Sequence, residues 1–287
     1  MTQTIPLANS PIDDLASAID PWLKHMTWRQ DYVTWRERRL YQEQYQAERI
    51  AQIERHARPL AGARLLDLGA GMGGFAVAAA LCGAKVTVSE YNPQYCRIIN
   101  LRAERYNINL PIVTAAGENL PFRDAQFDLV VCWDVLEHVQ NPTAVLNEIS
   151  RTLAPGGQLL LTAINRRAWI DPHYHIPSLN WWPRHLAEWY INHRGRSKAT
   201  SQFRDMQRLS TMHYYDYSQF IKIARSAGFT TVDMNETALR EGRFVSKKAS
   251  RQRIRAGLRA IGIEQFAYKI QRAWYTGMFE LALTKAK

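Results

Sequence analysis

Few cysteines and no long hydrophobic runs limit what this 287-residue chain can be. Its three cysteines, Cys82, Cys96 and Cys132, lack the paired spacing of a metal site, so we expect reduced thiols in a cytoplasmic protein. The first residues show no basic segment followed by an apolar stretch, and we therefore expect no secretory signal. The longest apolar region, around residues 75–82, is too short to span a bilayer.

Acidic residues are scarce in one part of the chain only. The formal net charge is +11, and residues 240–287 contribute +9 of it, with twelve Lys and Arg against three Glu. The rest of the chain is nearly balanced. An apolar fraction of 46%, with 9 Trp, 13 Tyr and 9 Phe, indicates a folded globular protein with a sizeable core.

Short apolar strands alternate with helices from about residue 64. We predict strands at 64–68, 85–89, 111–115, 127–133 and 158–164, and helices at 73–81, 92–106 and 142–153. Beyond these we expect a helix near 217–227, a sixth strand at about 230–239 and a terminal strand at 278–284. The βαβ rhythm predicts a parallel sheet covered by helices.

The first predicted strand runs into a glycine-rich turn. Gly69, Gly71 and Gly74 fit the dinucleotide fingerprint, and Glu90 follows Gly69 at the spacing which that fingerprint asks for. The glycines alone are therefore compatible with a pyrophosphate ligand. Asp67 favours a different ligand, one with an ammonium or sulfonium group, because a carboxylate beside the turn repels a pyrophosphate.

Six short motifs follow one another in a specific order. They are Leu-Asp-Leu-Gly-Ala-Gly-Met-Gly at 66–73, Glu90, Gly-Glu-Asn-Leu-Pro-Phe at 117–122, Phe-Asp-Leu-Val at 127–130, Asp-Val-Leu-Glu-His-Val at 134–139 and Leu-Ala-Pro-Gly-Gly at 153–157. In this order they resemble the class I S-adenosylmethionine-dependent methyltransferases, most closely the small-molecule group that includes quinone-biosynthesis enzymes. The resemblance covers about residues 58–165, with weaker similarity at 213–240 and 277–287.

The resemblance implies an α/β fold with a doubly wound seven-stranded sheet, parallel except for one antiparallel C-terminal strand. It also implies S-adenosylmethionine as the cofactor. Gly69, Gly71 and Gly73 would let the backbone pass under the methionine part of this cofactor. Asp67 would anchor its amino end, and Glu90 would accept hydrogen bonds from both ribose hydroxyls.

Four further residues match cofactor positions of the family. Tyr91 would lie against the adenine face, Gly117 and Glu118 would meet the adenine edge, and Asp134 would adjoin the cofactor. The family commonly has an aspartate just before the glycine, whereas this chain has alanines at 115 and 116. Glu118 is therefore the candidate acceptor for the adenine amino group.

Asp134, Glu137 and His138 have the spacing i, i+3 and i+4, which places them on one face of a helical turn. Three interpretations remain open. The three residues hold a divalent cation, as in some quinone O-methyltransferases that this stretch resembles. Alternatively, His138 alone acts as a general base, or the residues serve the structure only.

Two insertions leave the carboxyl edge of the predicted sheet, where open α/β proteins bind ligands. The first, a cap after the fifth strand, is rich in Trp, Tyr and His. It offers His173, Tyr174 and His175 as groups that orient or deprotonate the methyl acceptor, and His213 follows directly after it.

The second insertion carries the basic charge and two apolar stripes at helical spacing. The first stripe has Ile254, Leu258 and Ile261, and Gly262 breaks the helix; the second stripe comprises Ile263, Phe266, Ala267, Ile270 and Trp274. We expect the second stripe to pack on the domain. The arginines at 251, 255, 259 and 272 would then line a site for an anion.

Two other partners suit a basic helix. It can lie on an acidic membrane surface beside a lipid-linked substrate. Nucleic acid is less favoured, because the fourth strand ends in Cys-Trp-Asp-Val and lacks the Asn-Pro-Pro-Tyr type of turn that amino-methylating enzymes use. At the other end of the chain, the spacing of Trp28, Tyr32 and Trp35 predicts an N-terminal helix that packs on the domain or closes over the cofactor.

The predicted organisation has six segments. They are an N-terminal helical extension (1–57), a cofactor-binding core (58–165), the aromatic cap (166–212), a core helix and sixth strand (213–240), the basic helical insert (241–276) and a terminal strand (277–287).

We expect an S-adenosylmethionine-dependent methyltransferase that methylates oxygen on an anionic small molecule or glycan. The alternative is a membrane-peripheral methyltransferase acting on a lipid, quinone or lipid-linked sugar. A non-catalytic binding protein is a third reading, and a nicotinamide oxidoreductase would be recognised by its binding of NAD.

Overall fold

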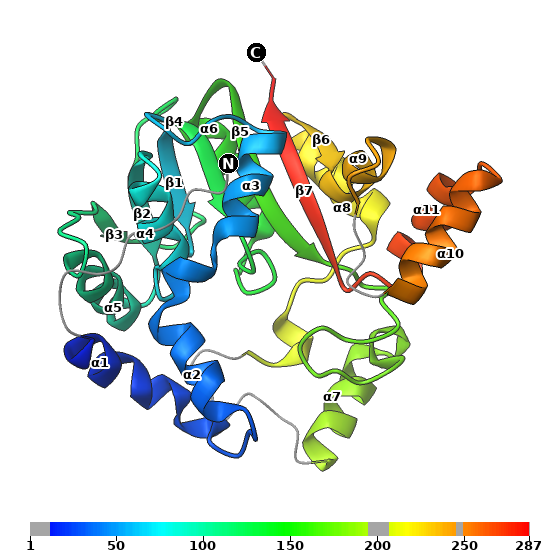
Figure 1. Cartoon of the computed structure of the whole chain (residues 1–287), viewed down its shortest axis with the longest axis horizontal. Helices are drawn as coiled ribbons and strands as arrows, with labels where there is room; N and C mark the ends of the chain where they lie inside the picture. The colour runs from blue at the N-terminus through cyan, green and yellow to red at the C-terminus, as the bar shows by residue number, and fades with distance from the viewer. Residues whose placement is uncertain (1–11, 195–206, 245–248, 287) are drawn as a thin grey trace.

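The computed structural model describes residues 12–194, 207–244 and 249–286. A seven-stranded sheet lies at the centre, in the order β3-β2-β1-β4-β5-β7-β6 (Figure 1). The strands are β1 (Arg64–Leu68), β2 (Lys85–Glu90), β3 (Ile112–Thr114), β4 (Phe127–Cys132), β5 (Leu153–Ile164), β6 (Phe229–Asp233) and β7 (Met278–Lys285). Only β7 runs antiparallel to its neighbours, so the predicted fold class is confirmed.

Helices cover both faces of the sheet and extend beyond its edge. The α-helices are α1 (Asp13–Leu23), α2 (Tyr32–Leu40), α3 (Ala47–His56), α4 (Gly74–Leu81), α5 (Pro93–Glu104), α6 (Pro142–Thr152), α7 (Arg184–His193), α8 (Tyr217–Ser226), α9 (Met234–Arg240), α10 (Ala249–Ala260) and α11 (Glu264–Trp274). The 3-10 helices are η1 (Lys24–Met26), η2 (Gln42–Tyr45), η3 (Leu179–Trp181) and η4 (Leu209–Thr211).

Alternation along β1 divides the core into two layers. Leu65 packs with buried residues of α3, α4 and α5 on one face of the sheet. Leu66 packs with buried residues of α6 and α8 on the other face. Both leucines are fully buried, as expected for a central strand covered on both sides.

Two helices begin with the Asn-Pro pattern that the sequence suggested for one of them. The Asn92 side chain accepts a hydrogen bond from the Gln94 N–H, and the Asn141 side chain accepts one from the Ala144 N–H. In both helices proline occupies the first turn, where its missing N–H costs nothing.

Two predicted boundaries are wrong. The sixth strand ends at Asp233, because the Asp233 side chain accepts from the Glu236 N–H and starts α9, where we predicted further strand to residue 239. β5 begins at Leu153, so Pro155 and the glycines after it lie within the strand. The β4–β5 pairing shifts register between Phe127 and Leu129 to accommodate them.

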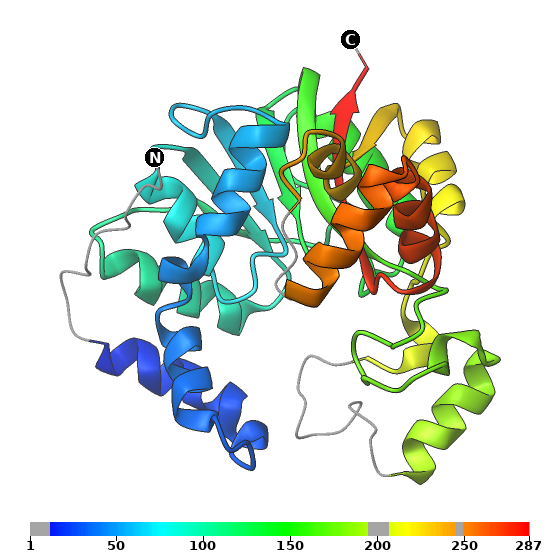
Figure 2. The same ribbon diagram turned by 45° about the vertical axis from the view of Figure 1, so that its right-hand side comes forward.

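The N-terminal helices and the cap lie at the same end of the sheet, near the carboxyl ends of the parallel strands (Figure 2). Tyr32 and Trp35 belong to α2 and pack on the α1–α5 cluster. Trp28 lies in the turn before α2 and is 74% exposed, so the predicted three-residue stripe is wrong at its first position.

A buried ion pair fixes the N-terminal extension to the core. Arg102 of α5 and Glu43 of η2 are both completely buried and form a salt bridge. The Arg102 guanidinium also donates to the carbonyls of Leu40 and Arg39, and its Nε donates to the carbonyl of Met72 in the glycine turn. This arginine therefore joins the extension to the glycine turn.

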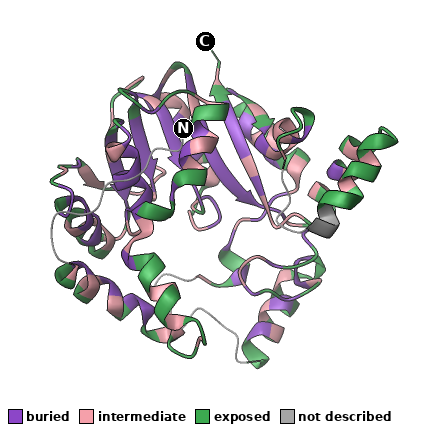
Figure 3. Cartoon of the chain, in the orientation of Figure 1, coloured by how far each residue is buried: buried purple, intermediate pink, exposed green. Residues whose placement is uncertain are grey.

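The two insertions bury their apolar residues to different extents. The cap has a small core of its own, formed by Ile164, Tyr174, Ile176, Leu179, Ala187, Ile191, Leu209, Met212 and Tyr214. The helices α10 and α11 form a hairpin whose surface is largely exposed (Figure 3). The expectation that the stripe of α11 packs on the domain is wrong. Within the described ranges, no helix is both long and apolar enough to cross a membrane.

Candidate active site

The glycine turn after β1 has the left-handed backbone conformation that its glycines predict. Gly69, Gly71 and Gly73 have φ values of 70°, 55° and 75°, in the left-handed region that favours glycine. A Cβ at Gly69 would collide with the Val135 side chain, and one at Gly73 would lie 2.7 Å from Cγ1 of Ile99. A Cβ at Gly71 would meet nothing within 4 Å, so open space adjoins the middle of the turn.

Two carboxylates at the ends of β1 and β2 flank this turn. Glu90 accepts from the Gly71 N–H at 2.8 Å and from the Asn92 N–H at 2.9 Å, and thereby fixes the turn. Asp67 is 4% exposed, and its Oδ2 has no hydrogen-bond partner among the described residues. Burial raises the pKa of Asp67 to about 7; Arg49 opposes this shift and Glu90 adds to it. A buried, incompletely satisfied carboxylate beside open space fits the cationic methionine end of S-adenosylmethionine.

The N-terminal extension contributes Arg49, which the sequence analysis missed. Its guanidinium lies 4.6 Å from the centre of the Trp133 ring, and its Nη2 lies 3.3 Å from Oδ2 of Asp134. Asp134 has a left-handed φ of 59°, and Oδ1 accepts from the Thr162 hydroxyl. No local pattern in the sequence marks Arg49, because its role depends on how α3 packs across the sheet edge.

The residues predicted to contact adenine differ in their exposure and in their hydrogen bonds. Tyr91 is 74% exposed after β2, where its ring is accessible to a ligand. Glu118 Oε1 accepts from the N–H groups of Gln140 and Asn141, so this carboxylate connects its loop to the start of α6. A Cβ at Gly117 would lie 3.3 Å from Val145. Contacts of these residues with adenine stay predictions.

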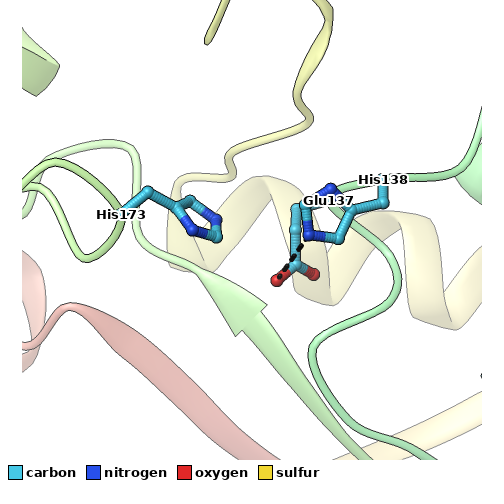
Figure 4. Close-up of side chains that lie close together, drawn as sticks. All are labelled: Glu137, His138 and His173. Carbon is cyan, nitrogen blue, oxygen red and sulfur yellow. Dashed lines mark ion pairs between the residues drawn. The ribbon is translucent and has the colours of Figure 1, made fainter. Parts of the chain in front are cut away.

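Figure 4 shows three side chains that lie close together: Glu137 and His138 from the segment after β4, and His173 from the cap. One ligand atom from each lies within 4.8 Å of the other two. The chain forms a turn at 136–138, so the predicted helical face of Asp134, Glu137 and His138 is wrong. Asp134 does not belong to the cluster, and His173 of the cap takes its place. We call these three side chains the Glu137 cluster.

The Glu137 side chain is almost completely buried, with 1% exposure. Neither of its carboxylate oxygens accepts a hydrogen bond from another residue in the described part of the chain. His138 Nε2 lies 4.0 Å from Glu137 Oε1, and the two imidazole rings of the cluster have centroids 5.6 Å apart. Burial raises the pKa of Glu137 to about 8; the backbone of Glu137 itself opposes this shift, and the nearby Asp134 adds to it.

The cap places His173 through one buried aspartate. Asp171 is completely buried, and its Oδ1 accepts from the N–H groups of His173 and Tyr174 at 2.9 and 2.7 Å. Around it lie Tyr214, whose ring is 6.2 Å from that of His173, and Arg184, which stacks 4.2 Å above Tyr214. His173 thus belongs to an ordered part of the cap.

The segment that leads out of the cap borders an open hollow of about 540 Å³. Its lining comprises His138, Val139, Gln140, Gln207, Arg208, Thr211 and His213. The His213 N–H donates to the Glu137 carbonyl, and the Gln207 side chain donates to the His138 carbonyl. His213 therefore lies beside the cluster. His175 is exposed and lies outside both the cluster and the hollow lining.

The cofactor turn and the Glu137 cluster are neighbours. β1 and β4 pair directly, with Asp67 opposite Val131. Val135, which precedes Glu137 by two residues, packs closely on Gly69. The open space beside the glycine turn therefore lies next to the segment that carries Glu137 and His138.

Comparison with known proteins agrees with this arrangement. Residues 41–234 match a family described as "Methyltransferase domain". A curated relative, the ubiquinone biosynthesis O-methyltransferase of Xanthomonas oryzae pv. oryzae, is 36% identical over 108 residues, which are 37% of this chain and 45% of the relative. The chain thus spans less than half the length of this relative.

Solved structures share the fold at low identity. An S-adenosylmethionine-dependent methyltransferase from Mesorhizobium loti has a TM-score of 0.53 at 15% identity, covering 82% of this chain and 96% of that one. The [4+2]-cyclase SpnF has a TM-score of 0.52 at 20% identity, covering 85% and 83%. The family match covers more than half of the chain, so the chain belongs to the methyltransferase domain family.

Proposed function

We propose that this enzyme methylates a hydroxyl oxygen of a small-molecule acceptor, and that the Glu137 cluster accepts the hydroxyl proton. One observation carries the proposal. The buried Glu137 carboxylate accepts no hydrogen bond from another described residue, yet lies beside two imidazoles and next to the cofactor turn. Such an arrangement is costly for stability, and groups with perturbed pKa values in these surroundings are typical of acid–base catalysis.

The chemistry divides between cofactor and protein. When bound, S-adenosylmethionine supplies an electrophilic methyl group on a sulfonium sulfur. Asp67 and the glycine turn would hold its methionine end; Val135 packs on this turn, and Glu137 follows two residues later in the chain. The methyl group would pass from sulfur to the acceptor oxygen, breaking the carbon–sulfur bond and leaving S-adenosylhomocysteine, and the Glu137 cluster would take up the hydroxyl proton. Holding the acceptor in line contributes much of the rate.

The acceptor is an aromatic hydroxyl compound with a negative charge. The name of the Xanthomonas relative supports an aromatic ring of the quinone type, although the match covers only part of that protein. Arg208 in the lining of the hollow supports the negative charge. Its side chain is 72% exposed and lies 3.9 Å from Glu188, so it remains accessible to an acceptor.

The same three side chains also fit a divalent cation. Two imidazoles and one carboxylate form a donor set that zinc uses in catalytic sites. A cation held by Glu137, His138 and His173 would lower the pKa of the acceptor hydroxyl. This second candidate keeps the acceptor and the reaction and changes only the group that activates the hydroxyl.

The decisive experiment replaces Glu137 with glutamine and measures production of S-adenosylhomocysteine from 3,4-dihydroxybenzoate. We expect kcat to fall about 100-fold or more, because a positioned base contributes at least that much. Affinity for S-adenosylhomocysteine, measured by calorimetry, stays within twofold. Glu54→Gln, on the exposed side of α3, is the matched control. A Glu137→Gln enzyme with full activity would refute the proposal.

The pH dependence distinguishes the two roles of the cluster. Glu137 must lose its proton before it can accept one, and its pKa is raised to about 8. For a base, kcat/KM rises with pH up to about 8, and Glu137→Gln lacks this rise. For a metal site, dialysis against a chelator abolishes activity and added Zn²⁺ restores it. Activity that survives chelation assigns the cluster to base catalysis.

A further inference from the structure

The outer face of α11 is apolar and exposed. Ile263, Phe266, Ile270 and Trp274 follow one side of the helix and are 44%, 66%, 45% and 41% exposed. The opposite side is fixed by Tyr268, which is buried and donates to the Asp233 carboxylate. The hairpin is therefore held to the domain by its inner side, and its apolar side faces outward.

The cap extends this face with further aromatic residues. The Trp169 N–H donates to the Trp274 carbonyl at 2.7 Å. The Trp181 ring packs edge-on against Trp274 with centroids 5.8 Å apart, and against Trp169 at 4.9 Å. Trp169 and Trp181 are 38% and 49% exposed. We call the continuous surface of these three tryptophans with Ile263, Phe266 and Ile270 the aromatic face.

Positive charge accompanies the aromatic face. Residues 249–276 contain six Lys and Arg against one Glu. Arg253, Arg259 and Lys269 are exposed on the two helices of the hairpin. Arg167, from the cap, lies 5.5 Å above the Trp274 ring.

We propose that the aromatic face docks on an anionic lipid bilayer. Trp, Ile and Phe on one side of a helix, with Lys and Arg beside them, are the features of helices that lie in the membrane interface. A second copy of this chain would bring the same positive charges together. A nucleic acid would pair with the basic side chains but would leave the apolar side chains exposed to water. The bilayer satisfies both features at once, whichever acceptor the enzyme methylates.

Docking at the aromatic face would also affect how the acceptor reaches the Glu137 cluster. Trp169 and His173 belong to one cap segment, which faces the bilayer at Trp169 and the Glu137 cluster at His173. An acceptor with an alkyl tail in the bilayer would thus reach the cluster along the cap.

Vesicle sedimentation of the full chain tests the proposal, with neutral phosphatidylcholine vesicles and vesicles containing 30% phosphatidylglycerol as the probes. We expect binding to the anionic vesicles that weakens in 0.5 M salt. Arg253→Gln with Lys269→Gln should weaken it about 10- to 30-fold, since each basic residue near the surface contributes about fivefold or somewhat less. Phe266→Ser with Ile270→Ser should weaken it at least as much.

Controls use exposed residues elsewhere. Lys222→Gln with Arg225→Gln on α8, and Val33→Ser on α2, should bind vesicles like the wild type. Methylation of water-soluble 3,4-dihydroxybenzoate should be unchanged in all these variants, which separates this proposal from the catalytic one. No binding to anionic vesicles, or binding that both double variants retain, would overturn it. So would a dimer in ultracentrifugation that Phe266→Ser with Ile270→Ser dissociates.

Discussion

The cap and the α10–α11 hairpin are two insertions at the same edge of one sheet, and both carry apolar residues at helical spacing. In the cap, α7 buries Ala187 and Ile191 in a core that the segments before and after it complete. In the hairpin, α11 buries Tyr268 alone among its residues. The difference lies in what folds over each helix. A periodic stripe predicts that an apolar face exists, and only the rest of the chain determines what covers it.

The largest effect should come from breaking the core of the cap. Leu179 lies in the core of the cap, and its side chain is 1% exposed. Leu179→Ala therefore removes buried apolar surface and leaves a cavity. We expect the free energy of unfolding to fall by about 2–5 kcal/mol, measured by urea denaturation. A loss below about 0.5 kcal/mol would show that the cap is as loosely packed as the hairpin.

The rate of methyl transfer should likewise depend on the cap. Since His173 belongs to the Glu137 cluster, His173→Gln should lower kcat about 30- to 100-fold in the S-adenosylhomocysteine assay. His175→Gln, two residues away and exposed, is the control and should stay within twofold of the wild type. Equal losses in the two variants would mean that the cap acts through its fold and not through His173.

The attachment of the hairpin is predicted to be weaker. Tyr268 donates at 3.0 Å to the buried Asp233 carboxylate, and Arg272 Nη1 also contacts that carboxylate at 3.0 Å. Tyr268→Phe removes one partner and should cost about 1–2 kcal/mol. Hydrogen exchange should then accelerate in α10 and α11 and stay unchanged in α7. Faster exchange in both insertions would show that they unfold together.

The smallest effect should come from the aromatic face. Phe266 is 66% exposed, so Phe266→Ser should change the free energy of unfolding by less than about 0.5 kcal/mol in the absence of lipid. Denaturation in buffer without vesicles measures this value. A loss comparable to that of Leu179→Ala would mean that Phe266 is covered in solution.

The sequence predicted local features well and long-range contacts poorly. The glycine turn and the Asn92 cap follow from neighbouring residues and were confirmed. The seven-stranded sheet with one antiparallel strand, which the resemblance implied, was confirmed as well. The end of β6 was wrong because the β-branched run before Asp233 outweighed the capping signal of Asp233 and Glu236. His173 was a candidate, but its meeting with Glu137 depends on the path of the cap. Arg49 carried no signal, since α3 is brought to the site by tertiary packing alone.

The buried Arg102–Glu43 pair affects how ligands enter and leave the enzyme. Arg102 binds the extension at Leu40 and Glu43 and the glycine turn at Met72, so separating them would leave a charged group buried without its partner. Breaking such a pair costs about 3–5 kcal/mol, which would slow any route that lifts the extension about 100-fold or more. We therefore expect spent cofactor to be exchanged for fresh cofactor without the N-terminal extension lifting from the glycine turn.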